Sequence, residues 1–256
     1  MSTHLPPTKI RPATIEDIRN MPLFDGVVDS AIETLLSSSF ICKLERNRKL
    51  YPMRSEGKYL YVIREGYLAL RVDSKVLRWD NFLAWRGPGQ ILGEFALLYS
   101  EIIGANLREI DDLKLLGLTG ELKATEECEL LEIEGSAFVS VASNDANIYR
   151  NLSRLLIKKM IQEGKRSEVI QMAPALRRVA KTLLLLIEER GYRPGEKKVI
   201  RGRIVQLDLA GFIGVSREHV NLQMMALKNA GLIAYEDDGE IEILDEKRLR
   251  NEIEAY

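Results

Sequence analysis

Between Phe40 and Ile133 the chain alternates hydrophobic and polar positions in short runs. Tyr59–Ile63 is aromatic and β-branched, and the segment Leu68–Val72 alternates large apolar residues with Ala69 and Arg71. A period of two residues is typical of half-buried strands, and the glycines at positions 57, 66, 87, 89 and 93 fall at turn-like intervals. The pattern predicts a barrel or sandwich of short antiparallel strands.

Helical periods flank this region. One helix is predicted to start after Asp29-Ser30, with these residues as its N-cap, and a longer one to run from about Asp145 to Met172. The longer helix would extend about 40 Å. Its apolar stripe consists of Ile148, Leu152, Leu155 and Leu156. Because a small barrel alone cannot bury such a helix, we expect these four residues to form a homodimer interface. Packing along the helix's own domain is the alternative.

The segment from Val205 to Leu227 carries the most informative pattern. Two short helical patterns meet at Gly214, and Ser216 stands where the N-cap of the second helix is expected. The residues expected to be buried are Leu209, Ala210 and Ile213 in the first helix and Val220, Met224 and Leu227 in the second. This is the pattern of a helix-turn-helix. The strand patterns Leu232–Tyr235 and Glu240–Leu244 predict a hairpin after it, which makes the motif winged.

Composition excludes several classes of protein. Of the 256 residues 46% are hydrophobic and 29% are charged, and the formal net charge is −1, which excludes a uniformly basic nucleic-acid coat protein. No apolar run reaches the roughly 18 residues of a membrane span. The N-terminal residues lack the apolar segment of an export signal. We therefore expect a cytoplasmic protein with no membrane partner.

Enzyme and metal chemistry also lack the residues that they need. The motifs of serine hydrolases, phosphate-binding loops, zinc proteases and dinucleotide-binding folds are absent, so we expect no enzymatic activity. Cys42 and Cys128 are too few for a zinc or iron–sulfur site, and we expect both to be buried. His4 and His219 are far apart in the sequence. We therefore predict no metal site and no cofactor.

Charge is unevenly distributed in the C-terminal third. Residues 174–231 contain 11 Lys and Arg against 5 Asp and Glu, whereas residues 232–256 contain 3 against 9. The basic part includes Lys197, Lys198, Arg201 and Arg203 besides the second helix of the helix-turn-helix. Such a patch is typical of DNA binding. The acidic wing tip, Glu236-Asp237-Asp238, is expected to be repelled by phosphate.

From about Leu23 to Leu249 the chain resembles the CRP/FNR superfamily of bacterial transcription regulators. The resemblance rests on Gly87–Leu98 (GPGQILGEFALL), on Asp208–Val220 (DLAGFIGVSREHV) and on Gly231–Ile233. It implies an α+β fold with three parts: an antiparallel β-roll of jelly-roll and cyclic-nucleotide-binding type, a long dimerisation helix and a winged helix-turn-helix. We expect them to occupy residues 1–143, 144–173 and 174–256.

The resemblance also suggests an effector pocket containing Gly93, Glu94 and Thr119. In members that bind cyclic AMP the Glu holds the ribose, and an Arg neutralises the cyclic phosphate. Here the position of that Arg falls on Leu118, although Arg108, in the long segment between Leu98 and Thr119, is a candidate substitute. Because a buried phosphate without a cation is costly, we do not expect activation by cyclic AMP in the usual way. The cysteines are too few for an iron–sulfur sensor, and the roll has no His for haem. The identity of any small-molecule effector stays open.

The second helix of the helix-turn-helix is expected to contact base edges. We expect Ser216 to cap it, Arg217 to approach guanine O6 and N7, and Glu218 to accept from cytosine N4. His219 and Asn221 would contact bases or phosphates, and Arg201 and Arg203 belong to the basic patch. The resemblance implies a homodimer with two such helices about 34 Å apart on palindromic double-stranded DNA. RNA polymerase is a further candidate partner.

Two alternatives stay open at this stage. One is a regulator that binds DNA constitutively, with a degenerate sensor domain that serves as a scaffold. The other is a small-molecule-binding module without DNA binding, against which the basic patch around Arg201 and Arg217 argues. We expect the polar stretch from Lys159 to Arg166 of the long helix to be the place where sensor state changes helix pairing.

Overall fold

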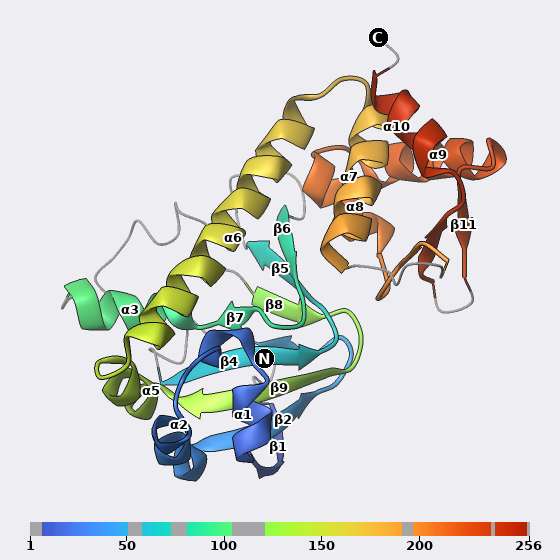
Figure 1. Ribbon diagram of the computed structural model, residues 1–256. Helices are drawn as coiled ribbons and strands as arrows, with labels where there is room; N and C mark the ends of the chain where they lie inside the picture. Colours follow the sequence, from blue (N-terminus) through green and yellow to red (C-terminus); the bar gives the residue numbers. More distant parts are fainter. Residues whose placement is uncertain are drawn as a thin grey trace. The chain divides into compact units, whose positions relative to one another are not determined.

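The computed structural model describes residues 7–50, 58–72, 81–103, 121–190, 197–236 and 239–254. The chain divides into two compact units, residues 1–74 with 85–160 and residues 75–84 with 161–256. The boundary between the units falls within helix α6 (Ala146–Gln171), whose ends confirm the predicted long helix. This helix therefore contributes residues to both units (Figure 1).

Two sheets precede α6 (Figure 1). In spatial order the first contains β1 (Thr8–Pro12), β2 (Ser39–Leu44), β9 (Cys128–Glu134), β4 (Tyr59–Glu65) and β7 (Ile91–Leu92). The second contains β3 (Lys49–Leu50), β8 (Glu121–Ala124), β5 (Leu68–Val72) and β6 (Asn81–Arg86). The pairs β1–β2, β2–β9, β9–β4, β4–β7, β3–β8 and β8–β5 are antiparallel. The predicted antiparallel β architecture is confirmed.

One hydrophobic core joins the two sheets. It takes Cys42 and Ile63 from the first sheet and Leu68 and Leu122 from the second, among others. Both cysteines are buried, as predicted, with Cys42 at 0% and Cys128 at 1% exposure. Burial raises the pKa of each thiol to about 12, because a thiolate loses its hydration there. Both thiols are therefore protonated, inert parts of the core at neutral pH.

The opposite face of the first sheet packs against helices. These elements are α1 (Ile15–Arg19), the 3₁₀ turn η1 (Pro22–Phe24), α2 (Asp29–Leu35), α5 (Gly135–Ala142) and the first half of α6. A second 3₁₀ turn, η2 (Leu36–Ser38), and α3 (Glu94–Ile103) complete the helical elements before α5 in the described residues. The predicted cap of α2 was wrong: Asp29 already lies in the helix, and the N-cap is Val28, without a side-chain hydrogen bond. Asp29 instead favours the first turn through its charge.

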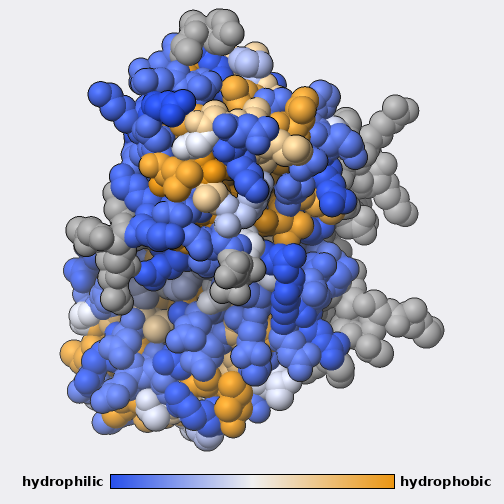
Figure 2. All heavy atoms as spheres, turned by 90° about the vertical axis from the view of Figure 1, so that its right-hand side faces the viewer, coloured by the Kyte–Doolittle hydropathy of each residue, from blue (hydrophilic) through white to orange (hydrophobic). Residues whose placement is uncertain are grey.

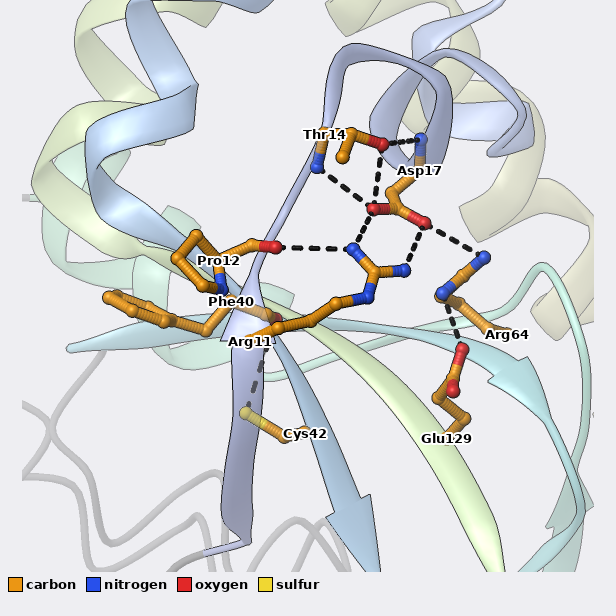
Figure 3. Close-up of polar contacts among 8 residues, drawn as sticks. All are labelled: Arg11, Pro12, Thr14, Asp17, Phe40, Cys42, Arg64 and Glu129. Carbon is orange, nitrogen blue, oxygen red and sulfur yellow. Dashed lines mark hydrogen bonds and ion pairs between the residues drawn. The ribbon is translucent and has the colours of Figure 1, made fainter.

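The sequence pattern did not predict β1 and α1, which are held by a buried carboxylate. Asp17 is 5% exposed and accepts two hydrogen bonds from the Arg11 guanidinium, at 2.5 and 2.9 Å. It also accepts from the Thr14 backbone N–H and hydroxyl, forming a capping box, and pairs with Arg64 at 3.0 Å (Figure 3). The hydrogen bond from Arg11 is the main reason that the pKa of Asp17 is well below its usual range. This carboxylate ties α1 to β1 and β4.

Besides residues 75–84, the second unit contains the end of α6 and the elements that follow it. They are α7 (Ala175–Arg190), β10 (Val199–Ile200), α8 (Gln206–Ile213), α9 (Arg217–Asn229), β11 (Ile233–Tyr235), β12 (Ile241–Ile243) and α10 (Glu246–Glu254). Helix α7 contributes more buried hydrophobic residues to this unit than any other described element, with Leu183–Ile187 all buried. The strands form a small antiparallel sheet in the order β10-β12-β11. The hairpin predicted after the helix-turn-helix is therefore confirmed.

Candidate DNA-binding interface and sensor motif

A glycine and a serine define the turn between α8 and α9. Gly214 ends α8 in the left-handed region, with φ of 71°, which a residue without Cβ adopts most readily. Ser216 is the N-cap of α9, and its hydroxyl oxygen accepts from the His219 backbone N–H at 3.3 Å. The predicted turn and cap are confirmed.

The two helices of this motif are held together by their apolar faces. All the residues predicted to be buried are buried: Leu209, Ala210, Ile213, Val220, Met224 and Leu227. Their spacing of three and four residues places them on one face of each helix. The opposite face of α9 is therefore presented to solvent.

The side chains expected to contact DNA lie along the exposed part of α9. Arg217, Glu218, His219 and Asn221 are all exposed. A hydrogen bond from its own backbone N–H and one from the Ser216 hydroxyl lower the pKa of Glu218, so this carboxylate is an acceptor at neutral pH. The Asn221 amide oxygen accepts from the Gln206 side chain at 3.3 Å. Asn221 thus also links α9 to α8.

The basic residues outside α9 fall into two groups. Arg201 and Arg203 are exposed. Lys197, by contrast, pairs with Glu236 at 3.1 Å and with Glu242 at 3.2 Å, and Lys198 pairs with Glu246 at 2.6 Å. The acidic residues after position 232 therefore offset part of the positive charge counted along the sequence. Asp237 and Asp238 lie outside the described residues.

Two arginines that the sequence analysis did not single out hold the end of α8. Arg166, in α6, donates to the carbonyl oxygens of Phe212 at 3.3 Å and Gly211 at 3.4 Å. Arg178, in α7, donates to the carbonyl oxygen of Ile213 at 3.1 Å. The last carbonyls of a helix lack partners within it and carry its negative partial charge, which cations stabilise. Both arginines lie about 35 to 45 residues from their partners, so no local pattern marks them.

The sensor motif centres on an ion pair. Gly93 has φ of +87°, and Glu94 follows it as the first residue of α3. Lys159 of α6 pairs with Glu94 at 2.5 Å and donates to the Ile91 carbonyl oxygen at 2.7 Å. The two charged side chains are only 15% and 13% exposed. Lys159, the first residue of the polar stretch expected to change helix pairing, is thus bound to a residue of its own unit.

Only part of the predicted effector pocket lies among the described residues. Gly93 and Glu94 are at the Lys159 pair, whereas Arg108, Leu118 and Thr119 lie outside the described residues. Of the long segment 99–118, residues up to Ile103 continue α3.

Of the four residues predicted to form the dimer interface, three are buried within their own unit and the fourth, Leu156, is partly buried. Ile148, Leu152 and Leu155 are 0%, 3% and 8% exposed, in the same core as α2 and the first sheet, and Leu156 packs against that core. The helices before α6 supply the apolar surface that the barrel alone would lack. A different set of α6 side chains is exposed: Tyr149 at 38%, Ile157 at 55%, Met160 at 72% and Ile161 at 53%.

The sequence predicts neither a metal site nor a membrane-spanning helix. In the described parts of the chain, no three His, Cys, Asp or Glu side chains are grouped so that they could hold a metal ion. Within the same residues, no helix has both the length and the hydrophobicity needed to cross a lipid bilayer.

Comparison with known proteins finds a matching family model for the C-terminal part and relatives that cover most of the chain. Residues 177–252 match the model of the Crp-like helix-turn-helix domain. The "Cyclic AMP receptor protein" of Thermus thermophilus is 24% identical over 223 residues, covering 84% of this chain and 89% of that protein. The "CRP-like cAMP-activated global transcriptional regulator" of Mycobacterium tuberculosis is 24% identical over 227 residues, covering 89% and 94%.

A solved structure gives the same fold. A CRP-family transcriptional regulator from Thermus thermophilus superposes with a TM-score of 0.62 at 20% identity, covering 83% of this chain and 96% of the other. The fold and the helix-turn-helix define a DNA-binding transcription regulator. These similarities support a regulator of the CRP/FNR type. Its relatives are transcription regulators and not enzymes, which agrees with the predicted absence of catalytic activity.

Proposed function

We propose that this regulator acts as a homodimer that recognises a palindromic DNA site with α9 in the major groove. The observation that carries the proposal is the capped helix α9, which buries one face and exposes Arg217, Glu218, His219 and Asn221 on the other. Arg217 would donate to guanine O6 and N7, and the ionised Glu218 would accept from cytosine N4. Arg201 and Arg203 would contact phosphates, because both are exposed cations in the same unit.

The exposed side chains of α6 support dimerisation through a surface other than the one that periodicity suggested. Ile157, Met160 and Ile161 are more than half exposed, and exposed apolar clusters on a long helix are typical of helix pairing. We therefore assign the contact between copies to these residues, with Tyr149 at the start of the helix. Residues 144–173 would then form the dimerisation helix between a sensor domain of residues 1–143 and a DNA-binding domain of residues 174–256.

A selection of genomic DNA fragments by the purified, effector-free protein tests DNA recognition. We expect enrichment of a two-fold-symmetric sequence, with an affinity that falls steeply as salt rises. Failure to enrich any sequence, both without additives and with a metabolite extract, would contradict the proposal. It would favour a small-molecule-binding module without DNA binding.

Sedimentation of two variants tests the dimer contact. Ile157→Glu and Met160→Glu each place a charge on the exposed apolar surface of α6, so both should shift the protein towards monomer. Lys158→Glu is the matched control, because Lys158 is exposed between these positions and its replacement should leave the dimer unchanged. Dimers of equal stability in all three variants would place the contact elsewhere.

A second proposal concerns the effector. The ion pair of Glu94 with Lys159 favours a regulator that does not respond to cyclic AMP, although the relatives named above include cyclic-AMP-activated proteins. A ligand hydroxyl that used Glu94 would have to compete with an ammonium group that is already bound in a largely buried site. DNA affinity measured with and without cyclic AMP should be equal. A large increase with cyclic AMP would reject this second proposal without affecting the proposal of DNA recognition.

A further inference from the structure

Helix α9 exposes two large apolar side chains in the middle of its outward face. Leu222 is 61% exposed and Met225 is 53% exposed. A surface helix normally presents polar residues on this face, because exposed apolar side chains gain nothing from folding. On the face of the molecule shown in Figure 2, apolar patches interrupt a mainly hydrophilic surface. Contact with an apolar group outside the chain would remove these two side chains from water.

The spacing along the helix places Leu222 and Met225 in the same stripe as Glu218. These residues stand at positions i, i+4 and i+7, which share one face of an α-helix. The stripe lies opposite Val220, Met224 and Leu227, which are buried at 1% exposure or less. Because Glu218 begins the stripe, the apolar pair continues the surface that is proposed to contact bases.

We propose that Leu222 and Met225 contact the C5-methyl groups of thymines in the major groove. In that groove the methyl group is the apolar feature of the base edges and distinguishes thymine from cytosine. A phosphate is the wrong partner for this stripe, because its charged member is the ionised Glu218. The inference rests on the proposed function and deepens it. Arg217 and Glu218 would select a G·C pair, and the next turn of the helix would select A·T pairs by shape and apolar contact.

Replacing single thymines by deoxyuridine in the enriched DNA site tests the methyl contact directly. The two bases pair identically and differ only in the methyl group. We expect one or two thymine positions in each half-site at which this replacement lowers the affinity of the parent protein roughly fourfold, the value for one buried methyl group. Leu222→Asn should reduce that ratio to about one at its own position, because the apolar contact is then lost. Leu222→Met should retain a ratio above one.

Leu244→Asn is the matched control, since Leu244 is a leucine of the same unit, 51% exposed, that is not on α9. It should leave the ratio unchanged. Circular dichroism and sedimentation of every variant check that helix content and oligomeric state are preserved. Two outcomes would overturn the inference. In the first, replacing thymine by deoxyuridine leaves the affinity unchanged at every site. In the second, the replacement lowers the affinity, but by the same factor for the parent, Leu222→Asn and Met225→Asn.

The remaining outcomes separate this inference from the proposed function. If the parent protein binds no DNA sequence, the proposed function itself fails, and the methyl contact fails with it. If binding is specific but insensitive to the methyl group, only the inference fails. If Leu222→Asn converts a dimer into a monomer, the stripe is a contact between copies of the chain, and the inference is overturned.

Discussion

Two glutamates in this regulator lie in the first turn of a helix and differ in their surroundings. Glu94 stands at the first position of α3 and is paired with Lys159 in a largely buried site. Glu218 lies in the first turn of α9, is fully exposed, and is oriented by Ser216 and by its own backbone N–H. The helix end stabilises both carboxylates. The first, however, already has a protein partner, whereas the second faces solvent. Charges of the first kind should determine stability, and charges of the second kind should determine DNA affinity.

The largest effect is expected from breaking the buried pair. Lys159→Met leaves the Glu94 carboxylate largely buried without its ammonium partner, so the free energy of unfolding should fall by about 3 kcal/mol. Urea denaturation followed by circular dichroism measures this change. Lys158→Met is the matched control, because Lys158 is the exposed neighbour on α6 and its loss should change stability by less than about 0.5 kcal/mol. Equal stability of both variants would remove the contrast between the two glutamates.

A second internal carboxylate sharpens the comparison through its pH dependence. Asp17→Asn loses a charge that is hydrogen-bonded to Arg11, and should destabilise the protein by about 1.5–3 kcal/mol at pH 7. Because the folded state lowers the pKa of Asp17 from its ordinary 3.8, its stabilisation is present above about pH 4 and is lost as the pH falls further.

The parent and the Asp17→Asn variant should therefore converge in stability as the pH is lowered from about 5 to about 2. Asp29→Asn is the control, since the Asp29–Arg19 pair is about half exposed on both sides and contributes little. A stability difference between parent and Asp17→Asn that is constant over this pH range would contradict the assignment.

For substitutions on α9, we expect a change in DNA affinity and not in the free energy of unfolding. Arg217→Ala should weaken specific DNA binding by about 1–3 kcal/mol and relax one base position, with no change in the urea midpoint. Arg203→Ala should weaken binding to all sequences alike and reduce the salt dependence. Binding titrations on the enriched site, on a single-base variant and on unrelated DNA compare the two. If Arg217→Ala keeps full preference for the same base, its proposed contact with guanine is incorrect.

The smallest effect is expected at Ser216, the N-cap of α9. Ser216→Ala removes the acceptor for the His219 backbone N–H, and should lower the free energy of unfolding by about 1 kcal/mol. Ser216→Thr should recover most of this loss, because threonine also caps helices. Thermal denaturation of the three proteins provides the test. A Ser216→Ala variant as stable as the parent would show that the hydrogen bond at 3.3 Å contributes nothing.

Local patterns predicted the elements whose partners are close in sequence. The helix-turn-helix, the wing hairpin and both ends of α6 follow from spacing, capping and turn residues within a few positions. The capping box from Thr14 to Asp17 was a readable signal for α1, but the prolines around it concealed the pattern. Fold features with local causes were therefore predictable even where they were missed.

Features that depend on distant partners were not predictable in the same way. Periodicity correctly gave the stripe of Ile148, Leu152 and Leu155, but it contains no information on which surface covers a stripe. The pair of Lys159 with Glu94 joins residues 65 positions apart, and Arg166 meets Phe212 across 46. The residues of α9 that we propose to contact bases could be selected from the sequence, since a cap and one helix define their positions.

Gly164 lowers the stability of helix α6 locally. It lies between Lys159, which is fastened to Glu94, and Arg166, which is fastened to the end of α8. Glycine weakens a helix by about 1 kcal/mol relative to alanine, and apart from its chain neighbours and the nearby backbone of α6 no described residue has an atom within 4 Å of where a Cβ would be. Close packing therefore does not require a glycine at this position. Between the residues that bind Glu94 and the end of α8, α6 therefore contains a residue that lowers its helical stability and that packing does not demand.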